Sequence, residues 1–181
     1  MRLLLHTCCA PCLIYPLENM RKQKTIDVAG FFYNPNIYPL VEYQKRRQAV
    51  VNLSGENNLE VIYQEYIPSE FLAAVEAKKD TPERCVICWN LRLRKTAQIA
   101  KEKWFDAFST TLLVSPYQDH ELLKKIGTDI SQETGVYFYY EDFRPGFRKA
   151  HEQAKAKGMY CQNYCGCMYS QMEQCKKPQK P

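Results

Sequence analysis

Apolar residues along this chain alternate between short runs of branched and aromatic side chains and longer stretches with a helical period. The short runs predict strands at residues 2–6, 26–33, 59–66, 106–113 and 136–140. The longer stretches predict helices at residues 11–22, 40–53, 88–104 and 119–134, and a further helix from about Ser69, whose hydroxyl suits an N-cap. After the last strand, helical segments are expected to continue to the end of the chain.

Strands and helices that alternate at this spacing predict parallel strands joined by right-handed crossovers. The expected fold class is therefore α/β, a three-layer parallel sheet with a cysteine-rich helical C-terminal segment. We expect residues 1–175 to form a single α/β domain and residues 176–181 a disordered tail, because no repeat or low-complexity linker divides the chain. Sites in such sheets lie where strands end and the chain enters the helices.

The composition narrows the class of protein. The 181 residues are 45% hydrophobic, which is enough for a full core. The net charge of +5 suits an anionic partner such as a nucleic acid, but it is also common among soluble enzymes. No apolar run approaches the roughly 18 residues of a membrane span, and the run at residues 3–5 is too short for a signal peptide. We expect a cytoplasmic protein without a membrane segment.

Nine cysteines fall into three clusters, and none lies outside them. The clusters are, in chain order, Cys8 with Cys9 and Cys12, then Cys85 with Cys88, then Cys161, Cys165, Cys167 and Cys175. A soft metal or a redox pair needs several sulfurs close together, and thiols stay reduced in the cytoplasm. The clusters therefore indicate metal binding or redox catalysis.

The first two clusters have the spacing of metal ligands. Cys8 and Cys9 directly follow the first strand, and Cys85 and Cys88 form a CxxC pair at the expected start of a helix, where the helix dipole favours thiolates. Two pairs supply four ligands, which suit a 4Fe-4S cluster or a structural zinc ion. Cys12 is a spare thiol beside them, either a ligand of a second metal ion or a buried packing residue.

The sequence Tyr164-Cys-Gly-Cys167 has the features of a redox pair. One glycine between two cysteines permits the tight turn that closes a strained, readily reduced disulfide. Cys165 and Cys167 are therefore candidates for a redox-active disulfide, with metal ligation as the alternative. To exchange electrons with the first cluster, the C-terminal segment must fold back over the loop after the first strand. A nucleotide cofactor is not expected, since the chain has no GxGxxG or GxxxxGKS/T loop.

Six motifs carry a family resemblance. In chain order they are HTCCAPC, FFYNPNIYPLVEYQKR, ERCVICWNLRLRKTA, TTLLVSPYQ, EDFRPGFRKA and MYCQNYCGCMYS, and together they resemble the QueH family of epoxyqueuosine reductases. The resemblance implies reduction of epoxyqueuosine at the wobble position of tRNA to queuosine, in a fold like the adenine-nucleotide α-hydrolase (HUP-like) group. It also implies a 4Fe-4S cluster on Cys8, Cys9, Cys85 and Cys88, and a redox-active disulfide between Cys165 and Cys167.

A tRNA partner requires contacts to phosphates and to unpaired bases. The candidates lie in basic stretches with interleaved aromatic residues, and they are Arg46, Arg47, Arg92 and Arg144. Each stretch can equally be the solvated face of a helix. The electron donor is external, and the sequence does not identify it. Two other classes stay open, a zinc-stapled RNA-binding module without catalysis and a thiol-disulfide oxidoreductase that needs no metal.

Overall fold

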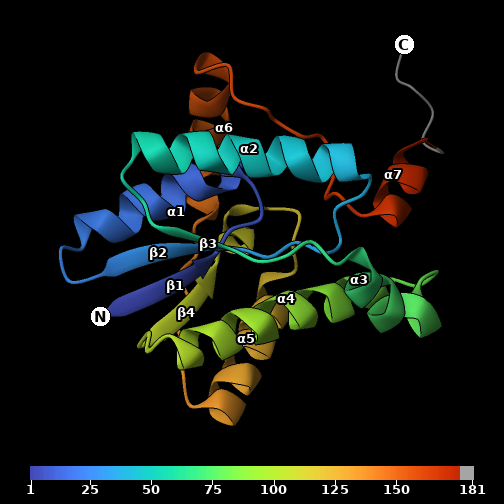
Figure 1. Cartoon of the computed structure of the whole chain (residues 1–181), viewed down its shortest axis with the longest axis horizontal. Coiled ribbons are helices and arrows are strands. Elements are labelled where there is room, and N and C mark those ends of the chain that lie inside the picture. Colours follow the sequence, from blue (N-terminus) through green and yellow to red (C-terminus); the bar gives the residue numbers. More distant parts are fainter. Residues whose placement is uncertain (176–181) are drawn as a thin grey trace.

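A five-stranded sheet forms the centre of the protein in the computed structural model, which describes residues 1–175. The predicted tail, residues 176–181, lies outside the described residues. The strands are β1 (Arg2–His6), β2 (Asp27–Phe32), β3 (Val61–Tyr63), β4 (Ala107–Thr110) and β5 (Tyr137–Phe138). Their order is β3-β2-β1-β4-β5, and all neighbours are parallel (Figure 1). The predicted α/β class is confirmed, and the topology is consistent with a HUP-like fold.

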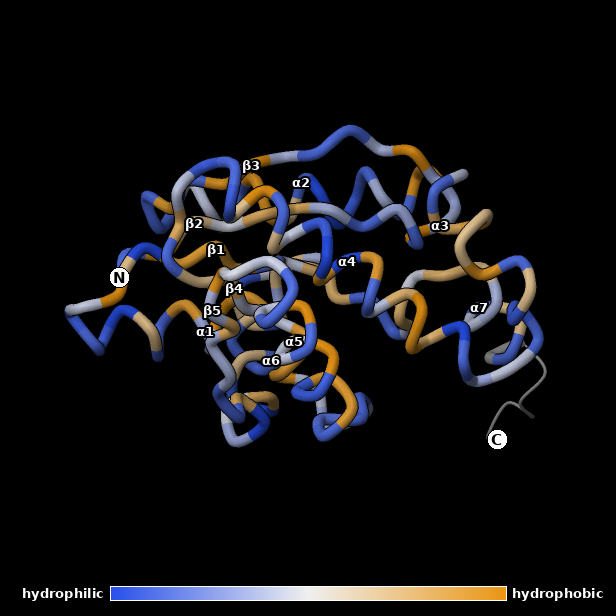
Figure 2. The backbone as a smooth tube through the Cα atoms, turned by 90° about the horizontal axis from the view of Figure 1, so that it is seen from below, coloured by the Kyte–Doolittle hydropathy of each residue, from blue (hydrophilic) through white to orange (hydrophobic). Residues whose placement is uncertain are grey.

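Helices cover both faces of the sheet and produce three layers (Figure 1). One face carries α1 (Ala10–Lys22), α2 (Leu40–Glu56) and α6 (Phe147–Ala156), and the other carries α4 (Glu83–Glu102) and α5 (His120–Thr134). The short helices α3 (Pro68–Val75) and α7 (Met168–Cys175) lie beyond the carboxyl ends of the strands, on the right in Figures 1 and 2. Three short 3-10 helices are η1 (Glu76–Lys78), η2 (Thr111–Val114) and η3 (Arg144–Gly146).

Some elements differ from the predicted boundaries, and the differences have local causes. β4 ends at Thr110 rather than at residue 113, because the Thr110 hydroxyl accepts a hydrogen bond from the Leu112 amide and turns the chain into η2. β3 and β5 are edge strands that pair on one side only. They are shorter than predicted, since β3 has three residues and β5 has two. Helix α3 begins at Pro68 with Ile67 as its N-cap, so the predicted cap at Ser69 is wrong.

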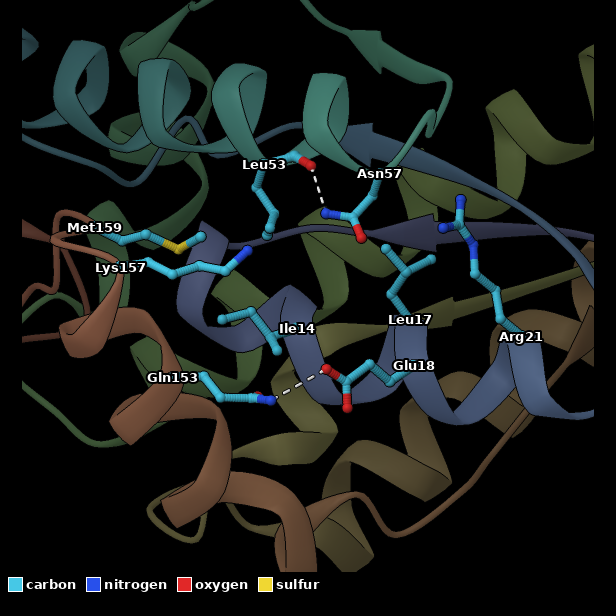
Figure 3. A pocket seen from close by; sticks show the side chains of 9 residues that line it. All are labelled: Ile14, Leu17, Glu18, Arg21, Leu53, Asn57, Gln153, Lys157 and Met159. Atoms are coloured by element: carbon cyan, nitrogen blue, oxygen red, sulfur yellow. Dashed lines mark hydrogen bonds between the residues drawn. The ribbon is translucent and has the colours of Figure 1, made fainter.

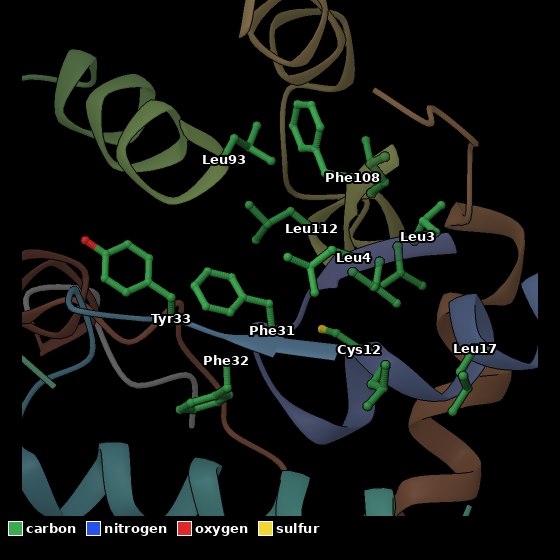
Figure 4. Close-up of a cluster of buried hydrophobic side chains, with 14 of the residues drawn as sticks. Leu3, Leu4, Cys12, Leu17, Phe31, Phe32, Tyr33, Leu93, Phe108 and Leu112 are labelled. Atoms are coloured by element: carbon green, nitrogen blue, oxygen red, sulfur yellow. The ribbon is translucent and has the colours of Figure 1, made fainter. Parts of the chain in front are cut away.

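The core surrounds the central strand β1. Residues 3–5 are fully buried, because β1 has a parallel neighbour on each side and helices on both faces. Phe31, Phe32 and Phe108 from the neighbouring strands complete the centre of this apolar cluster (Figure 4). Among residues 1–175, no helix has the length and apolarity needed to cross a membrane.

Two helical glycines report on how tightly the layers pack. A Cβ atom on Gly127 of α5 would overlap the Phe138 ring, whereas a Cβ atom on Gly55 of α2 has no neighbour within 4 Å. We expect Gly127→Ala to lower the free energy of unfolding by about 1–3 kcal/mol through overpacking. Gly55→Ala should raise it by up to about 1 kcal/mol, since alanine favours the helix. Urea unfolding followed by circular dichroism measures both, and equal effects would contradict the packing argument.

Candidate active site

The loops after β1 and β4 meet at the carboxyl edge of the sheet. β1 and β4 are neighbours, but the chain continues from them to opposite sides of the sheet. Ligand sites in open α/β sheets lie at such a switch point. The Cys8 amide donates a hydrogen bond to Thr111 Oγ1 at 3.0 Å, which joins the loop after β1 to the start of η2. The first cysteine cluster therefore occupies the position that this fold favours for a site.

Cys8, Cys9 and Cys12 form a compact set that we call the N-terminal thiol group. Cys9 is the N-cap of α1 and has an extended backbone, Pro11 occupies the first turn, and Cys12 follows directly. The three sulfur atoms all lie within 4.8 Å of one another, and those of Cys8 and Cys9 are 3.8 Å apart. Within the described part of the chain, no other set of three or more histidine, cysteine or acidic side chains is this compact.

Hydrogen bonds separate the pKa values within the N-terminal thiol group. Bonds from Cys12 and Cys9 hold the pKa of Cys8 well below its usual range despite burial, and the Thr111 hydroxyl adds a third bond at 3.2 Å. The pKa of Cys12 lies well above its usual range, because its hydrogen bonds to Cys8 and Cys9 and its burial favour the thiol. Cys8 therefore ionises first, and the thiolate is the form that binds metal.

The N-terminal thiol group suits a soft metal in both chemistry and spacing. Tetrahedral metal–sulfur bonds of about 2.3 Å separate two ligand sulfurs by about 3.8 Å, which is the distance between Cys8 and Cys9. Gln162 Nε2 donates to Cys9 Sγ at 2.8 Å, and hydrogen bonds to sulfur tune the potential of iron–sulfur sites. The donor set fits a soft metal ion or an iron–sulfur cluster, and it does not fit a hard cation such as Mg²⁺.

Cys85 and Cys88 lie in the first two turns of α4, which begins before the predicted residue 88. Burial raises the pKa of Cys88 to about 11, against the opposing charge of Arg92. Cys88 belongs to the same small buried cluster as Cys167, so the CxxC pair adjoins the third cysteine cluster. The predicted four-ligand set stays a prediction, and its members are Cys8, Cys9, Cys85 and Cys88.

The sulfurs of Cys165 and Cys167 lie 3.6 Å apart on either side of Gly166. Gly166 has a φ of +112°, which glycine adopts without strain. Cys165 is exposed and Cys167 is buried. Hydrogen bonds with Cys167 and then Ser170 lower the pKa of Cys165 to about 5, while the bond to Cys165 raises the pKa of Cys167 far above its usual range. An exposed thiolate beside a buried thiol suits dithiol–disulfide exchange.

The C-terminal segment, residues 159–167, folds back over the loop after β1. Gln162 contacts Cys9 Sγ, although 153 residues separate the two in sequence. Tyr38, after β2, donates its amide hydrogen to the Gly166 carbonyl at 2.8 Å and fixes the segment further along. The predicted return of this segment is therefore confirmed, and the first and third cysteine clusters share one end of the sheet.

Two arginines predicted to contact tRNA phosphates are buried instead. Arg46 is 2% exposed and Arg92 is 5% exposed, because both stand on the inner sides of their helices. Arg46 pairs with Glu42 and donates to the Cys165 carbonyl. The charge of Arg92 acts on the thiol of Cys88 and on other buried groups of the site. Neither guanidinium faces solvent, so the predicted phosphate contacts are not available to these two residues.

His6, at the end of β1, is a buried residue with both ring nitrogens hydrogen-bonded. Nδ1 lies 2.9 Å from Thr110 Oγ1 and Nε2 lies 3.2 Å from the Tyr33 carbonyl. Burial, and then the charge of Arg92, lower the pKa of His6 to about 4. The ring is therefore neutral at neutral pH and supports the strand ends structurally.

Arg47 and Arg144 are exposed, and their role in tRNA binding stays a prediction. Near Arg144, the exposed Tyr117 ring packs edge-on against Phe147, with 5.8 Å between ring centroids. Arg148 follows Phe147 and is also exposed. We call the set of Tyr117, Arg144, Phe147 and Arg148 the aromatic–basic surface.

A groove of about 230 Å³ lies between α1, α2 and α6 (Figure 3). Apolar, charged and amide side chains line it together, namely Ile14, Leu17, Glu18, Arg21, Leu53, Asn57, Gln153, Lys157 and Met159. None of these residues is a cysteine, and Met159 is the one that also belongs to the C-terminal segment.

Two residues that contact the N-terminal thiol group were not predicted. Thr111 directly follows β4, the neighbour of β1, so the rule that sites lie at strand ends could have indicated it. Gln162 carries no comparable signal in the sequence, because only the return of the C-terminal segment brings its amide to Cys9.

The lowered pKa of Cys165, together with its exposure, predicts selective alkylation of this thiol, since Cys8 also has a lowered pKa but is less exposed. With a pKa of about 5, Cys165 is a thiolate between about pH 6 and 8, whereas Cys88, with a pKa of about 11, is protonated there. We expect iodoacetamide to modify Cys165 first in the reduced protein, at a rate nearly independent of pH in this range. Peptide mass spectrometry identifies the modified thiol. Cys167→Ala should move the onset of Cys165 alkylation to higher pH, and an unshifted profile would contradict the stated cause.

Fold and site together define the class, an α/β protein with a redox-competent and metal-competent thiol site at the switch point of a parallel sheet. Comparison with known proteins then identifies the family. The model of the family described as Epoxyqueuosine reductase QueH matches residues 3–173. The chain belongs to this family and is an oxidoreductase, which confirms the resemblance carried by the six motifs.

Curated relatives extend over nearly the whole chain. A Thermotoga maritima protein named Epoxyqueuosine reductase QueH is 40% identical over 182 residues, which cover 96% of this chain and 92% of the relative. The protein of the same name from Dehalococcoides mccartyi is 38% identical, over 99% of this chain and 98% of its own length. A Streptococcus pyogenes relative of that name is 32% identical over 93% of this chain and 69% of its own.

Proposed function

We propose that this protein reduces the epoxide of epoxyqueuosine at the wobble position of tRNA, the last step of queuosine biosynthesis. Family membership supports this substrate. The structural observation that carries the chemistry is the contact of Gln162 with Cys9, which brings a dithiol and a metal-competent thiol group to one end of the sheet. We place the reaction in the cytoplasm, the expected location of the protein and of its tRNA substrate.

The removal of an epoxide oxygen requires a fixed number of electrons and protons. Two carbon–oxygen bonds break, a carbon–carbon double bond forms, and two electrons and two protons convert the oxygen to water. Oxidation of the Cys165 thiolate and the Cys167 thiol to a disulfide releases two electrons and one proton. One oxidation of this pair therefore supplies the electrons for one reduction of substrate, the second proton comes from water, and an external reductant restores the reduced pair.

We propose a 4Fe-4S cluster as the cofactor, with four ligands, Cys8, Cys9, Cys85 and Cys88. When bound, the cluster supplies one-electron transfer next to the substrate. The protein contributes hydrogen bonds from Thr111 and Gln162 to the sulfurs, and the charges of Arg46 and Arg92 offset the negative charge of thiolates. Cys12 is the proposed ligand of a second metal ion, which would supply Lewis acidity toward the epoxide oxygen.

The proposed partner is tRNA that carries epoxyqueuosine, and the aromatic–basic surface is its proposed contact. Tyr117 is 82% exposed, and a ring of this kind can stack on an unpaired base of the anticodon loop. The Phe143 amide, next to this surface, donates to the Leu113 carbonyl of η2 at 3.2 Å. Since η2 begins at Thr111, which bonds Cys8, the surface adjoins the candidate active site.

Binding of tRNA is expected to depend on salt, but moderately. With a net charge of +5 and few phosphate contacts, log affinity should fall against log salt with a slope of about −3 to −6. Tyr117→Ala should weaken binding by about 1–3 kcal/mol. Trp104→Ala is the matched control. Trp104 is 84% exposed, but it lies next to Arg2, at the amino end of β1 and away from the carboxyl end where the site lies. Fluorescence anisotropy measures these affinities, and a flat salt response would contradict nucleic-acid binding.

The reaction itself is tested by anaerobic incubation with epoxyqueuosine-bearing tRNA and a reductant, followed by mass spectrometry of the nucleosides. Queuosine is the expected product. A brown protein with broad absorbance near about 400 nm supports iron and sulfur. Bound zinc without turnover would favour the RNA-binding module, and full turnover by the metal-depleted protein would favour the thiol-disulfide oxidoreductase.

A further inference from the structure

Arg46 lies at the centre of a buried network that joins α2 to the C-terminal segment. Its Nε donates to Glu42 Oε1 at 2.6 Å. Its Nη1 donates to the Cys165 carbonyl at 3.0 Å, and its Nη2 donates to the Tyr164 carbonyl at 3.2 Å. All three guanidinium nitrogens are engaged, and two of them hold the backbone at the start of the redox pair.

Two tyrosines close this network. Tyr160 donates its hydroxyl hydrogen to Glu42 Oε2, so both carboxylate oxygens of Glu42 are occupied. The Tyr164 ring lies 5.1 Å from the Arg46 guanidinium carbon, within the range of a cation–π contact. The Tyr164 hydroxyl reaches the Tyr38 carbonyl at 2.9 Å. Neighbours on both sides therefore fix the orientation of the guanidinium.

The backbone between Cys165 and Cys167 packs against the Arg46 side chain. A Cβ atom at Gly166 would lie 2.9 Å from Arg46 Nη1. The guanidinium thus packs directly on the glycine that separates Cys165 from Cys167, without room for any larger residue. A shift of Arg46 would move the backbone that carries both sulfurs.

The charge of Arg46 also reaches the N-terminal thiol group. Burial alone would lower the pKa of Arg46, but attraction to Cys9, then to Glu42, and also to Cys8 raises it above its usual value. The positive charge of Arg46 therefore interacts with the thiols of the first cluster, while its N–H groups hold the backbone of the third cluster. Cys9 and the C-terminal segment also touch directly through Gln162.

From this network we propose that Arg46 is a positioning residue, which holds the Cys165 and Cys167 pair beside the N-terminal thiol group for electron exchange. The electron exchange rests on the proposed function, whereas the docking of the segment rests on the geometry. The hydrogen bonds of Arg46 go to Glu42 and to backbone carbonyls, so it acts through the backbone that it holds. Lysine cannot replace it, because an ammonium lacks the rigid planar fork of donors.

Arg46→Lys and Arg46→Gln test the docking in the full-length protein prepared anaerobically. Arg47→Gln is the matched control for hydrogen exchange alone, because Arg47 is the next residue of α2 and is exposed, and exchange is measured without tRNA. We expect hydrogen exchange of the amides in residues 159–167 to accelerate about tenfold or more in both Arg46 variants, since hydrogen bonds to a charged group are lost. Exchange in β1 and β4 should stay as in the native protein. Native protection of residues 159–167 in both variants would overturn the proposal.

Kinetics separate positioning from a merely structural role. With epoxyqueuosine-bearing tRNA, both Arg46 variants should lose at least about tenfold in kcat with KM within about twofold, because the docking surface for tRNA is intact. Lysine should fail to rescue kcat, whereas ethylguanidinium should partly restore it in Arg46→Ala. An unchanged kcat, or full rescue by lysine, would overturn the role of Arg46.

Two further outcomes are decisive. If the native protein does not reduce epoxyqueuosine, the proposed function fails, and hydrogen exchange alone decides whether Arg46 holds the segment. If the Arg46 variants do not fold, Tyr160→Phe takes their place, because it removes one bond to Glu42 and leaves the guanidinium intact. This variant should accelerate exchange in residues 159–167 by a smaller factor, and no acceleration would overturn the proposal.

Discussion

Serine in place of Cys165 or Cys167 is expected to lower turnover of epoxyqueuosine-bearing tRNA at least about a hundredfold, a barrier increase of about 2.7 kcal/mol. One remaining thiol cannot form the internal disulfide, so the pair no longer delivers two electrons. The absorbance of the bound cofactor should be unchanged. Nucleoside mass spectrometry and visible spectra measure the two quantities on the same samples.

The control for this result is Cys161→Ser, which changes a half-buried thiol of the same cluster that lies outside the Cys165 and Cys167 pair. It should leave turnover and colour as in the native protein. Loss of colour in Cys165→Ser or Cys167→Ser would instead make these residues metal ligands. Unchanged turnover would remove their redox role.

Cys8→Ser and Cys9→Ser are expected to remove both the bound metal and the activity. A serine hydroxyl is a poor ligand for soft metals, and each variant breaks the pair of sulfurs that Cys8 and Cys9 form at 3.8 Å. Metal content per chain, measured by mass spectrometry of the acid-digested protein, should fall to near zero. A native metal content in both variants would exclude the N-terminal thiol group as the metal site.

Two further variants, measured in the same assay, assign roles to Cys85 and Cys12. Cys85→Ser should also abolish the cluster absorbance if the CxxC pair completes the four ligands. Cys12→Ser should lower the metal content but keep the cluster absorbance if Cys12 binds a second ion. If Cys12 only packs in the core, its substitution should change the free energy of unfolding and leave the metal content as it was.

The centre of the sheet was predictable because β1 is buried on both faces. A central parallel strand is mostly apolar, so residues 3–5 are a continuous run of leucines. The edge strands were less predictable, since the length of β3 depends on pairing with β2, where Phe32 accepts the last bond from the Gln64 amide. Local sequence does not record where a neighbouring strand ends.

The thiol clusters were predictable from spacing, but the buried charges were not. Arg46 and Arg47 are adjacent and chemically alike in the sequence, yet the first is buried and the second exposed. The difference arises from Glu42 one turn earlier and from carbonyls 118 and 119 residues later, which together satisfy the guanidinium. A helical pattern that treats every arginine as solvated cannot detect partners at that separation.

The segment that covers Cys9 is the last part of the site to be synthesised. All five strands end by Phe138, and ribosomes build chains from the N-terminus. The N-terminal thiol group therefore leaves the ribosome long before residues 159–167 can cover it. Once residues 159–167 close, release of the metal requires that they open again. We therefore expect a metal ion bound at the N-terminal thiol group to exchange slowly in the folded protein.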